Sequence, residues 1–133
     1  MTPSSIDQVE EFHDTFGIEV QIFPAFPDPQ IMLLRLQLLQ EELGELCHAM
    51  AKGDMLEALD ALTDLQYVLD GAYLALGLKD IKDLAFAEVH RSNMSKTDEH
   101  GRALKDASGR IMKSDRYSPP NLAPILQGLE LPR

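Results

Sequence analysis

Apolar residues recur at helical spacing over the first two-thirds of the chain and predict a series of α-helices. The first helix covers residues 5 to 16, with Ser5 as the expected N-cap and Gly17 as the stop. Its apolar face is formed by Ile6, Val9, Phe12, His13 and Phe16. The segment Phe23 to Pro29 holds three prolines and is typical of a linker.

Two long helices and one shorter helix are predicted after this linker. The first runs from about Gln30 to Lys52 and ends at Gly53, and the second begins at Asp54 or Met55 and ends at Gly77. A third helix extends to about Asn93, with Asp80 as its expected cap and Asp83 at the capping-box position.

The composition changes after Ser95 and predicts an irregular tail over residues 97 to 133. Arg102 to Lys113 contains two short mixed runs around Asp106-Ala107-Ser108-Gly109, a pattern that favours a small hairpin. Further on, any long regular element is prevented by Pro119, Pro120, Pro124 and Pro132. The chain as a whole predicts one all-α domain over residues 1–133, a bundle of four to five helices completed by dimerisation, as a homodimer or a dimer of dimers. The tail is expected to wrap this bundle or a partner subunit.

The helix over residues 30–52 carries two different faces when its residues are placed about 100° apart. The expected core face consists of Met32, Leu36, Leu39, Leu43, Leu46 and Met50. Glu41, Glu45 and His48 lie on the opposite side, with Glu42 beside them. Leu34 and Leu38 share that side, so residues 33 to 39 are apolar nearly all round. This segment predicts a helix buried on two faces, in a tight bundle or across a dimer interface.

The next helix has a matching acidic sector. Glu57, Asp60 and Asp64 fall within it, and Tyr67 and Gly71 extend it. The opposite apolar stripe consists of Leu62, Leu65, Leu69, Ala72 and Leu76. A short turn at Gly53 would pack the two helices antiparallel and bring their carboxylates face to face. The alternative, a solvated acidic surface, stays open from the spacing alone.

Charge and cysteine content narrow the functional classes. A net charge of −10 in 133 residues opposes binding to a nucleic-acid polymer, and the single cysteine, Cys47, excludes an intramolecular disulfide. The first residues contain no basic segment followed by an apolar run, and the longest apolar run is Ile31 to Leu34. We therefore expect a cytoplasmic protein without a signal peptide or membrane span.

Converging carboxylates in an apolar bundle repel one another, and a bound divalent cation relieves that repulsion. Oxygen ligands favour Mg²⁺, with Mn²⁺ as an alternative. Glu45-Leu46-Cys47-His48 also fits the Glu-x-x-His pattern of di-iron bundles, but no second copy of it stands on another helix. A non-enzymatic helical interaction protein is the other alternative. A nucleophile elbow and a glycine-rich phosphate loop are both absent from the sequence.

Two further groups of residues carry candidate binding chemistry. Arg91 and Lys96 stand beside Ser92, Asn93 and Ser95, which favours phosphate binding or, equally, simple complementation of a helix C-terminus. An aromatic group is a candidate for lining a base pocket or for the core, and consists of Phe12, Phe16, Phe23 and Phe26.

Three blocks resemble the MazG-like all-α NTP pyrophosphohydrolases, and specifically the phosphoribosyl-ATP pyrophosphohydrolase-like branch. They are Arg35-Leu36-x-Leu38-Leu39-x-Glu41-Glu42-x-x-Glu45, Asp60-Ala61-Leu62-Thr63-Asp64-Leu65-x-Tyr67-Val68 and Glu88-Val89-His90-Arg91-Ser92-Asn93-Met94-Ser95-Lys96. The resemblance covers about Val9 to Leu122. It implies Mg²⁺-dependent hydrolysis of a nucleoside triphosphate, or a related nucleotide such as phosphoribosyl-ATP, between the α and β phosphates. The products would be the monophosphate and pyrophosphate, with a house-cleaning or dUTPase- or dCTPase-like role.

Residue by residue, the resemblance implies metal ligation by Glu41, Glu42, Glu45 and Asp64. The family's glutamate position is occupied by Ala61, so Asp60 is the expected substitute and Glu57 stays in reserve. The implied catalytic base is Glu42 or Glu45, which would orient or deprotonate the attacking water. Implied substrate ligands are Asn93, Lys96, Arg91, Lys113 and Tyr117.

Overall fold

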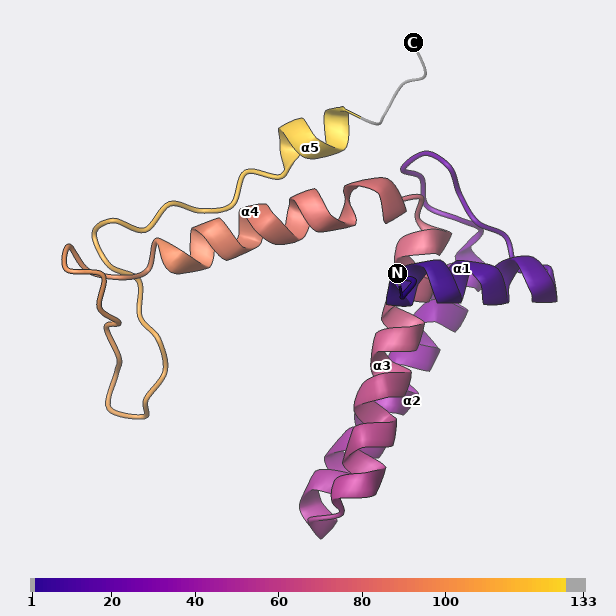
Figure 1. Ribbon diagram of the computed structural model, residues 1–133, viewed down its shortest axis with the longest axis horizontal. Coiled ribbons are helices and arrows are strands. Elements are labelled where there is room, and N and C mark those ends of the chain that lie inside the picture. Colours follow the sequence, from indigo (N-terminus) through magenta and orange to yellow (C-terminus); the bar gives the residue numbers. More distant parts are fainter. Residues whose placement is uncertain (1, 129–133) are drawn as a thin grey trace. The chain divides into compact units, whose positions relative to one another are not determined.

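The structure is a computed structural model, and it describes residues 2–128. Within that range the chain is all-α, which confirms the predicted fold class (Figure 1). Four α-helices are followed by an irregular tail with one short helix. In chain order they are α1 (Ser5–Phe16), α2 (Pro29–Lys52), α3 (Met55–Ala75), the 3₁₀ turn η1 (Lys79–Ile81), α4 (Lys82–Met94) and α5 (Ala123–Gln127).

Side-chain caps set the starts of the first three helices. The carboxylates of Asp28 and Asp54 accept hydrogen bonds from the amides of Gln30 and Glu57, at 2.8 and 3.0 Å, and so cap α2 and α3. The prediction of Ser5 as the cap of α1 was wrong, because Ser4 accepts from the Asp7 amide instead. Ser5 is the first helical residue and its hydroxyl donates to Asp70 at 2.7 Å.

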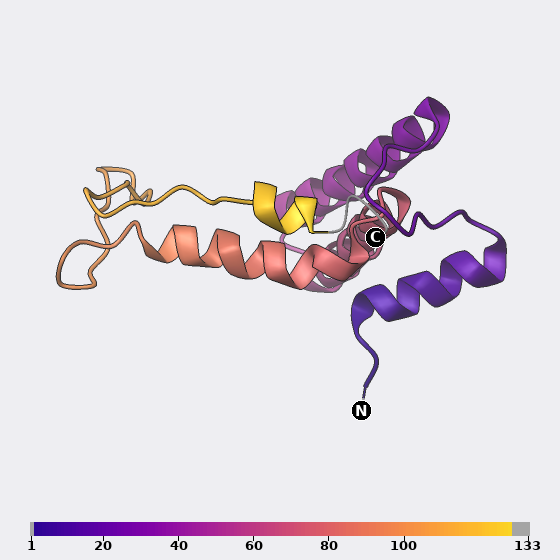
Figure 2. The same cartoon turned by 90° about the horizontal axis from the view of Figure 1, so that it is seen from above.

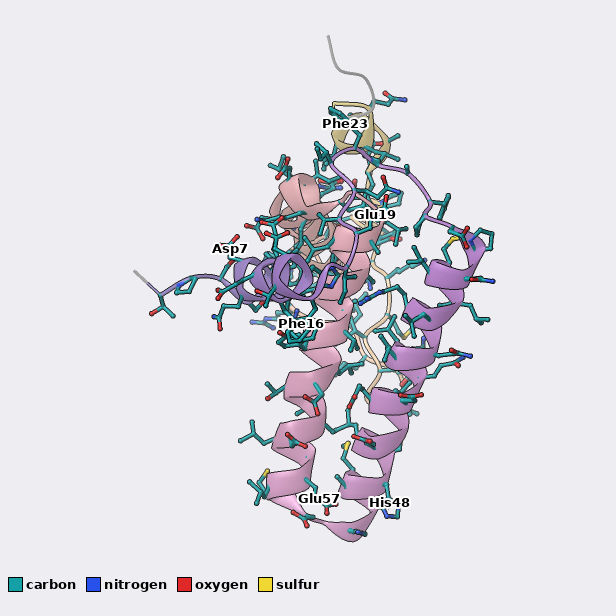
Figure 3. All side chains as sticks on the ribbon, turned by 90° about the vertical axis from the view of Figure 1, so that its right-hand side faces the viewer. Asp7, Phe16, Glu19, Phe23, His48 and Glu57 are labelled. Carbon is teal, nitrogen blue, oxygen red and sulfur yellow. The ribbon has the colours of Figure 1, made fainter. Side chains whose placement is uncertain are left out.

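The chain divides into two compact units, Met1–Asp80 and Ile81–Arg133. In the first unit, α2 and α3 form an antiparallel hairpin that turns at Gly53, and α1 lies across α3 (Figures 1 and 3). The small buried core sits where α1 meets α3 and consists of Ile6, Val9 and Leu74, with Val20 and Tyr73 packed against it. The acidic side chains of the hairpin lie between this crossing and the turn at Gly53.

The linker between α1 and α2 is held against the C-terminal end of α3. The Gln21 and Ala25 amides each donate at 3.0 Å, to the carbonyls of Leu74 and Leu76. Gly77 has a φ of 72°, and a Cβ there would run into the backbone carbonyl of Phe23. Glycine is therefore required at this position both by conformation and by the closeness of the linker.

The start of α4 differs from the prediction. Asp80 lies within the 3₁₀ turn, and α4 begins at Lys82 after Ile81, without a side-chain capping bond. The sequence has capping-box spacing between Asp80 and Asp83, but the preceding turn buries Ile81 and shifts the helix cap from residue 80 to residue 81.

In the second unit the tail runs back along α4, so that α5 lies beside this helix (Figure 2). The Ser118 amide donates to Ser95 Oγ at 2.8 Å, and Ser114 Oγ donates to the Thr97 carbonyl at 2.6 Å. The predicted small hairpin forms as a tight turn around Asp106, with an antiparallel bridge between Lys105 and Ile111.

The apolar stripe expected to form the core on α2 is largely exposed in the single chain. Leu36, Leu43 and Met50 are 57%, 51% and 69% exposed. On α3, Leu62 and Leu69 of the corresponding stripe are also exposed. The interpretation of these stripes as core was wrong for these five residues, whereas the other members of the stripes are partly buried: Met32, Leu39, Leu46, Leu65, Ala72 and Leu76. Among the described residues, the structure contains no helix with the length and apolar character needed to cross a membrane.

Candidate metal centre on the helical hairpin

Three carboxylates from the two arms of the hairpin converge. One ligand oxygen each from Glu42, Glu45 and Asp64 can be chosen so that all lie within 4.8 Å of one another. Glu42 and Glu45 are three residues apart on α2, so they occupy neighbouring positions on one helix face. Asp64 reaches the same place from α3, because the turn at Gly53 packs the two helices antiparallel.

Glu42 is the most constrained member of this cluster. Its Oε2 atom is buried and has no hydrogen-bond partner among the described residues. Burial raises the pKa of Glu42 above its ordinary value, and the negative charges of Glu45 and Asp64 raise it further. An ionised carboxylate in this place lacks a compensating positive charge, and a bound cation would supply one.

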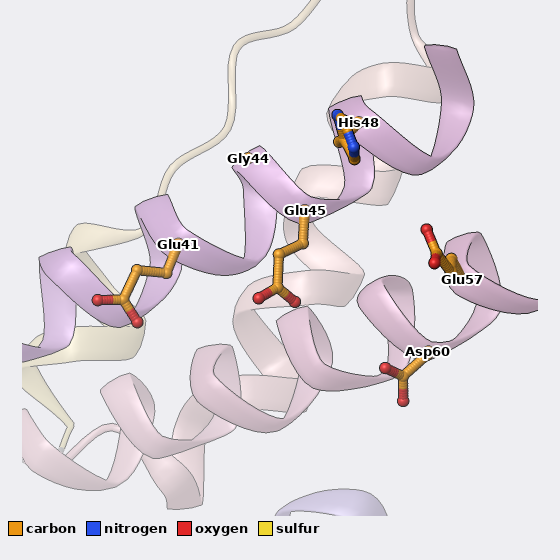
Figure 4. A pocket seen from close by; sticks show the side chains of 6 residues that line it. All are labelled: Glu41, Gly44, Glu45, His48, Glu57 and Asp60. Carbon is orange, nitrogen blue, oxygen red and sulfur yellow. The ribbon is translucent and has the colours of Figure 1, made fainter. Parts of the chain in front are cut away.

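A pocket of about 600 Å³ adjoins the cluster and shares Glu45 with it. It is lined by Glu41, Gly44, Glu45 and His48 of α2 and by Glu57 and Asp60 of α3 (Figure 4). Gly44 leaves open space, since a Cβ at this position would meet nothing within 4 Å. The five residues predicted to bind metal thus divide into the cluster (Glu42, Glu45, Asp64) and the rim of this pocket (Glu41, Asp60).

These donors fit a hard divalent cation. They are carboxylate oxygens, the ligands that Mg²⁺ prefers, and the site is partly open, which leaves room for water and phosphate oxygens. His48 contributes the only nitrogen donor on the pocket rim. Among the described residues, the three-donor cluster contains no histidine, so it lacks the ligand set of a di-iron bundle.

The shifted acidic position on α3 has a structural explanation. Ala61, which stands where the resemblance implies a glutamate, is 2% exposed and packs in the interior of the first unit. Asp60 lines the pocket instead, together with Glu57, the residue held in reserve (Figure 4). Both acidic side chains therefore lie on the pocket side of α3.

A buried cation at the other end of the hairpin was missed from the sequence. Arg35 is 8% exposed, and its guanidinium lies directly over Gly71, where a Cβ would collide with Nη1. His13 also lies here, and burial and the Arg35 charge lower the pKa of its imidazole. One signal for Arg35 existed, because it is the single charged residue within the apolar segment 31–39.

The predicted phosphate ligands Arg91, Asn93 and Lys96 belong to the second unit, at the end of α4. Arg91 forms a two-point ion pair with Glu88, at 2.8 and 2.9 Å, and its Nη2 also donates to the Pro119 carbonyl. Glu88 in turn accepts from the Asn121 amide at 2.7 Å. This arrangement, the Glu88 clamp, ties the tail to α4 and lowers the pKa of Glu88 to about 2, first through the hydrogen bonds from Arg91.

The remaining predicted ligands, Lys113 and Tyr117, are brought together in the tail. The Lys113 ammonium lies 4.7 Å from the centroid of the Tyr117 ring, at cation–π distance. Asn93 has an exposed side chain, and Lys96 is half-buried. The roles of these residues in substrate binding remain predictions.

The fold and this centre define an all-α protein whose helical hairpin presents carboxylates suited to a divalent cation. A family model described as phosphoribosyl-ATP pyrophosphohydrolase matches residues 9–93, which include both arms of the hairpin and most of α4. The chain belongs to the phosphoribosyl-ATP pyrophosphohydrolase family, as the resemblance in the three sequence blocks predicted.

A curated relative is similar to the chain over a shorter region. It is "Uncharacterized protein L479" of Acanthamoeba polyphaga mimivirus, 38% identical over 76 residues, which cover 53% of this chain and 30% of the relative. The chain thus matches less than a third of that protein's length.

Proposed function

We propose that the protein is a Mg²⁺-dependent hydrolase that cleaves a nucleoside triphosphate between the α and β phosphates and releases pyrophosphate. The observation that carries this proposal is the convergence of Glu42, Glu45 and Asp64 around a buried, partnerless carboxylate oxygen. Membership of a pyrophosphohydrolase family supports the reaction class.

The carboxylates would hold the cation, with Glu42, Glu45 and Asp64 as the first ligands and Glu41 and Asp60 on the adjoining rim. When bound, Mg²⁺ supplies charge neutralisation for the phosphates and lowers the pKa of a bound water. Glu45 belongs to both the cluster and the pocket, so its carboxylate is suited to accept a proton from an attacking water. Asn93 and Lys96 remain the proposed phosphate ligands.

The substitution Glu45→Gln tests the proposal, because it keeps the shape of the side chain and removes its charge. We expect it to reduce pyrophosphate release from nucleoside triphosphates with Mg²⁺ by about a hundredfold or more, the scale of a general base. Glu19→Gln is the matched control, since it removes one exposed charge from the segment after α1 (Figure 3). Release of orthophosphate in place of pyrophosphate, or full activity in Glu45→Gln, would reject the assignment.

We also infer that the protein acts as a homodimer. The exposed apolar stripe on α2 (Leu36, Leu43 and Met50) follows a seven-residue spacing, and α3 exposes Met55, Leu56, Leu59 and Leu62. Apolar surface of this extent on a single chain marks a protein interface, and a helical hairpin pairs readily with a second copy.

Leu43→Glu places a charge in the middle of the α2 stripe and should convert the dimer to a monomer of 14.9 kDa. Light scattering coupled to gel filtration measures the mass. The exposed Leu104→Glu, which changes an apolar residue of the tail, is the control and should leave the dimer intact. A wild-type mass of one chain would contradict the inference.

A further inference from the structure

The first unit has a second pocket apart from the acidic one. It has a volume of about 380 Å³ and is formed by α1 and α3, with Gln8, Glu11, Phe12, Thr15, Phe16 and Tyr67 as its lining. These aromatic and polar side chains are separate from those of the acidic pocket, since the two pockets share no lining residue.

Three aromatic rings make its apolar wall. The rings of Phe12 and Phe16 are 4.4 Å apart between centroids, and Phe12 meets Tyr67 edge to face at 5.6 Å and 86°. Phe16 is nevertheless 66% exposed, at the place where α1 crosses α3 (Figure 3). A clustered but open aromatic wall offers a planar ligand a surface on which to stack.

The position of Tyr67 connects this pocket to the carboxylates. Tyr67 follows Asp64 by three residues on α3, so the two side chains are neighbours on one helix face, about 4.5 Å apart along the axis. In a nucleotide one ribose separates the base from the α phosphate. A nucleotide whose phosphates lie at Asp64 therefore has its base within reach of the aromatic wall.

Glu11 supplies the charged acceptor among the polar groups of the pocket. The Gln8 amide nitrogen donates one hydrogen bond to the Pro3 carbonyl at 3.2 Å, and the Gln8 amide oxygen is an acceptor as well. The Glu11 carboxylate is exposed, and an ionised carboxylate accepts hydrogen bonds but cannot donate them. A carboxylate in this pocket complements an exocyclic amino group and opposes a carbonyl at the same place on the base.

We propose that the pocket between α1 and α3 is the nucleobase site, in which Phe16 and Tyr67 stack the base and Glu11 selects bases with an exocyclic amino group. This inference rests on the proposed function, because the proposed α–β cleavage puts the substrate's phosphates on the hairpin. It adds a substrate class: nucleotides of cytosine or adenine are preferred over those of uracil or thymine.

CTP and UTP form the sharpest test pair, because the amino group at C4 of cytosine is a carbonyl in uracil. Ribose 5-triphosphate, which carries no base, is the third substrate, and pyrophosphate release gives kcat/KM for each. We expect the wild type to prefer CTP over UTP and both over the base-free compound. Phe16→Ala should lower kcat/KM for CTP about tenfold, the scale of one base–aromatic stacking contact, and leave ribose 5-triphosphate unchanged.

Glu11→Gln replaces a pure acceptor by a side chain that also donates, and should reduce the preference for CTP over UTP toward one. Phe16→Leu keeps an apolar side chain without a ring and should behave like Phe16→Ala. Glu19→Gln controls for the loss of one charge, and circular dichroism checks that each variant folds. The proposal would be overturned if the ratios of kcat/KM among CTP, UTP and ribose 5-triphosphate were the same in the wild type and in the Phe16 variants. A Phe16 variant with a changed particle mass and unchanged kcat/KM ratios would also overturn the proposal, because Phe16 would then belong to an interface between copies of the chain.

A binding measurement separates failure of this proposal from failure of the proposed reaction. If the wild type releases pyrophosphate from none of the three substrates, the proposed function fails. CMP and UMP are then titrated into the metal-free protein while the ring resonances of Phe16 and Tyr67 are followed by NMR. Shifts of these resonances that are larger with CMP than with UMP support the base site, and the absence of shifts with both nucleotides overturns it.

Discussion

The Glu42 carboxylate has two opposing effects that Glu42→Gln separates. Its charge destabilises the metal-free protein through repulsion from the neighbouring carboxylates, and the same charge is expected to bind the cation. The oxygens of Glu42, Glu45 and Asp64 lie within 4.8 Å of one another. At that separation, two like charges repel by about 0.9 kcal/mol in bulk water and by about 3.5 kcal/mol at the effective dielectric constant of a protein surface. Glu42 is half-buried with a partnerless oxygen, so the value lies between these limits.

We therefore expect Glu42→Gln to stabilise the metal-free protein by about 1 to 3 kcal/mol at pH 7. For a domain of this size each kcal/mol raises the melting temperature by about 3 to 5 °C. With Mg²⁺ the stability difference between the two proteins shrinks, because wild type gains about 2.7 kcal/mol at a hundred times its dissociation constant. The variant lacks one ligand and should gain much less.

The measurement is thermal unfolding with EDTA and with Mg²⁺, for wild type, Glu42→Gln and the charge-matched Glu19→Gln. Glu19 lies away from the hairpin carboxylates (Figure 3), so its variant should follow wild type in both conditions. The reasoning is refuted if Glu42→Gln melts below wild type in EDTA, or if Mg²⁺ stabilises the two proteins equally.

Two further predictions concern the parts of the chain around the hairpin. Gly77→Ala should lower the free energy of unfolding, measured with denaturant, by about 3 kcal/mol, because left-handed backbone strain and a collision with the Phe23 carbonyl add together. Gly53 has the same φ within two degrees but open space around it, so Gly53→Ala should lower the same free energy by about 1 kcal/mol. Equal losses in the two variants would contradict this contact. Glu88 has a folded pKa of about 2, below its ordinary 4.5, so its contribution to stability is present above pH 4.5 and is lost as the pH falls through 2. Hydrogen exchange of the Asn121 amide should show protection at pH 6 that Glu88→Ala loses, because alanine has no acceptor, whereas equal protection in both proteins would exclude the clamp.

Local patterns predicted the helices well, since apolar spacing, the prolines of the linker and the glycines at 17 and 53 all act within a few residues. The acidic sectors were also visible, because residues three and four apart share a helix face whatever the tertiary structure. The prediction of Asp80 as the cap of α4 was wrong because its capping pattern competes with burial of the neighbouring Ile81, and burial depends on residues distant in sequence.

The division of the carboxylates was beyond sequence reasoning. Spacing placed Glu41, Glu42 and Glu45 together on one side of a helix, but only the packing of α3 decides that Glu42 turns toward Asp64 while Glu41 lines the open pocket. Arg35 was missed for the same reason, because its burial requires the absence of a side chain at Gly71 on another helix. The apolar stripes showed which residues avoid water, without showing whether the chain itself covers them.

The turn at Gly53 also has a kinetic consequence. All carboxylates of the metal centre lie on the two arms of one hairpin, with Glu45 and Asp60 separated by only 15 positions. Their approach is therefore the closing of a short loop, one of the fastest steps in folding. The same closure drives like charges together, so cations that screen or bind them should speed the folding of the hairpin as well as stabilise the folded protein.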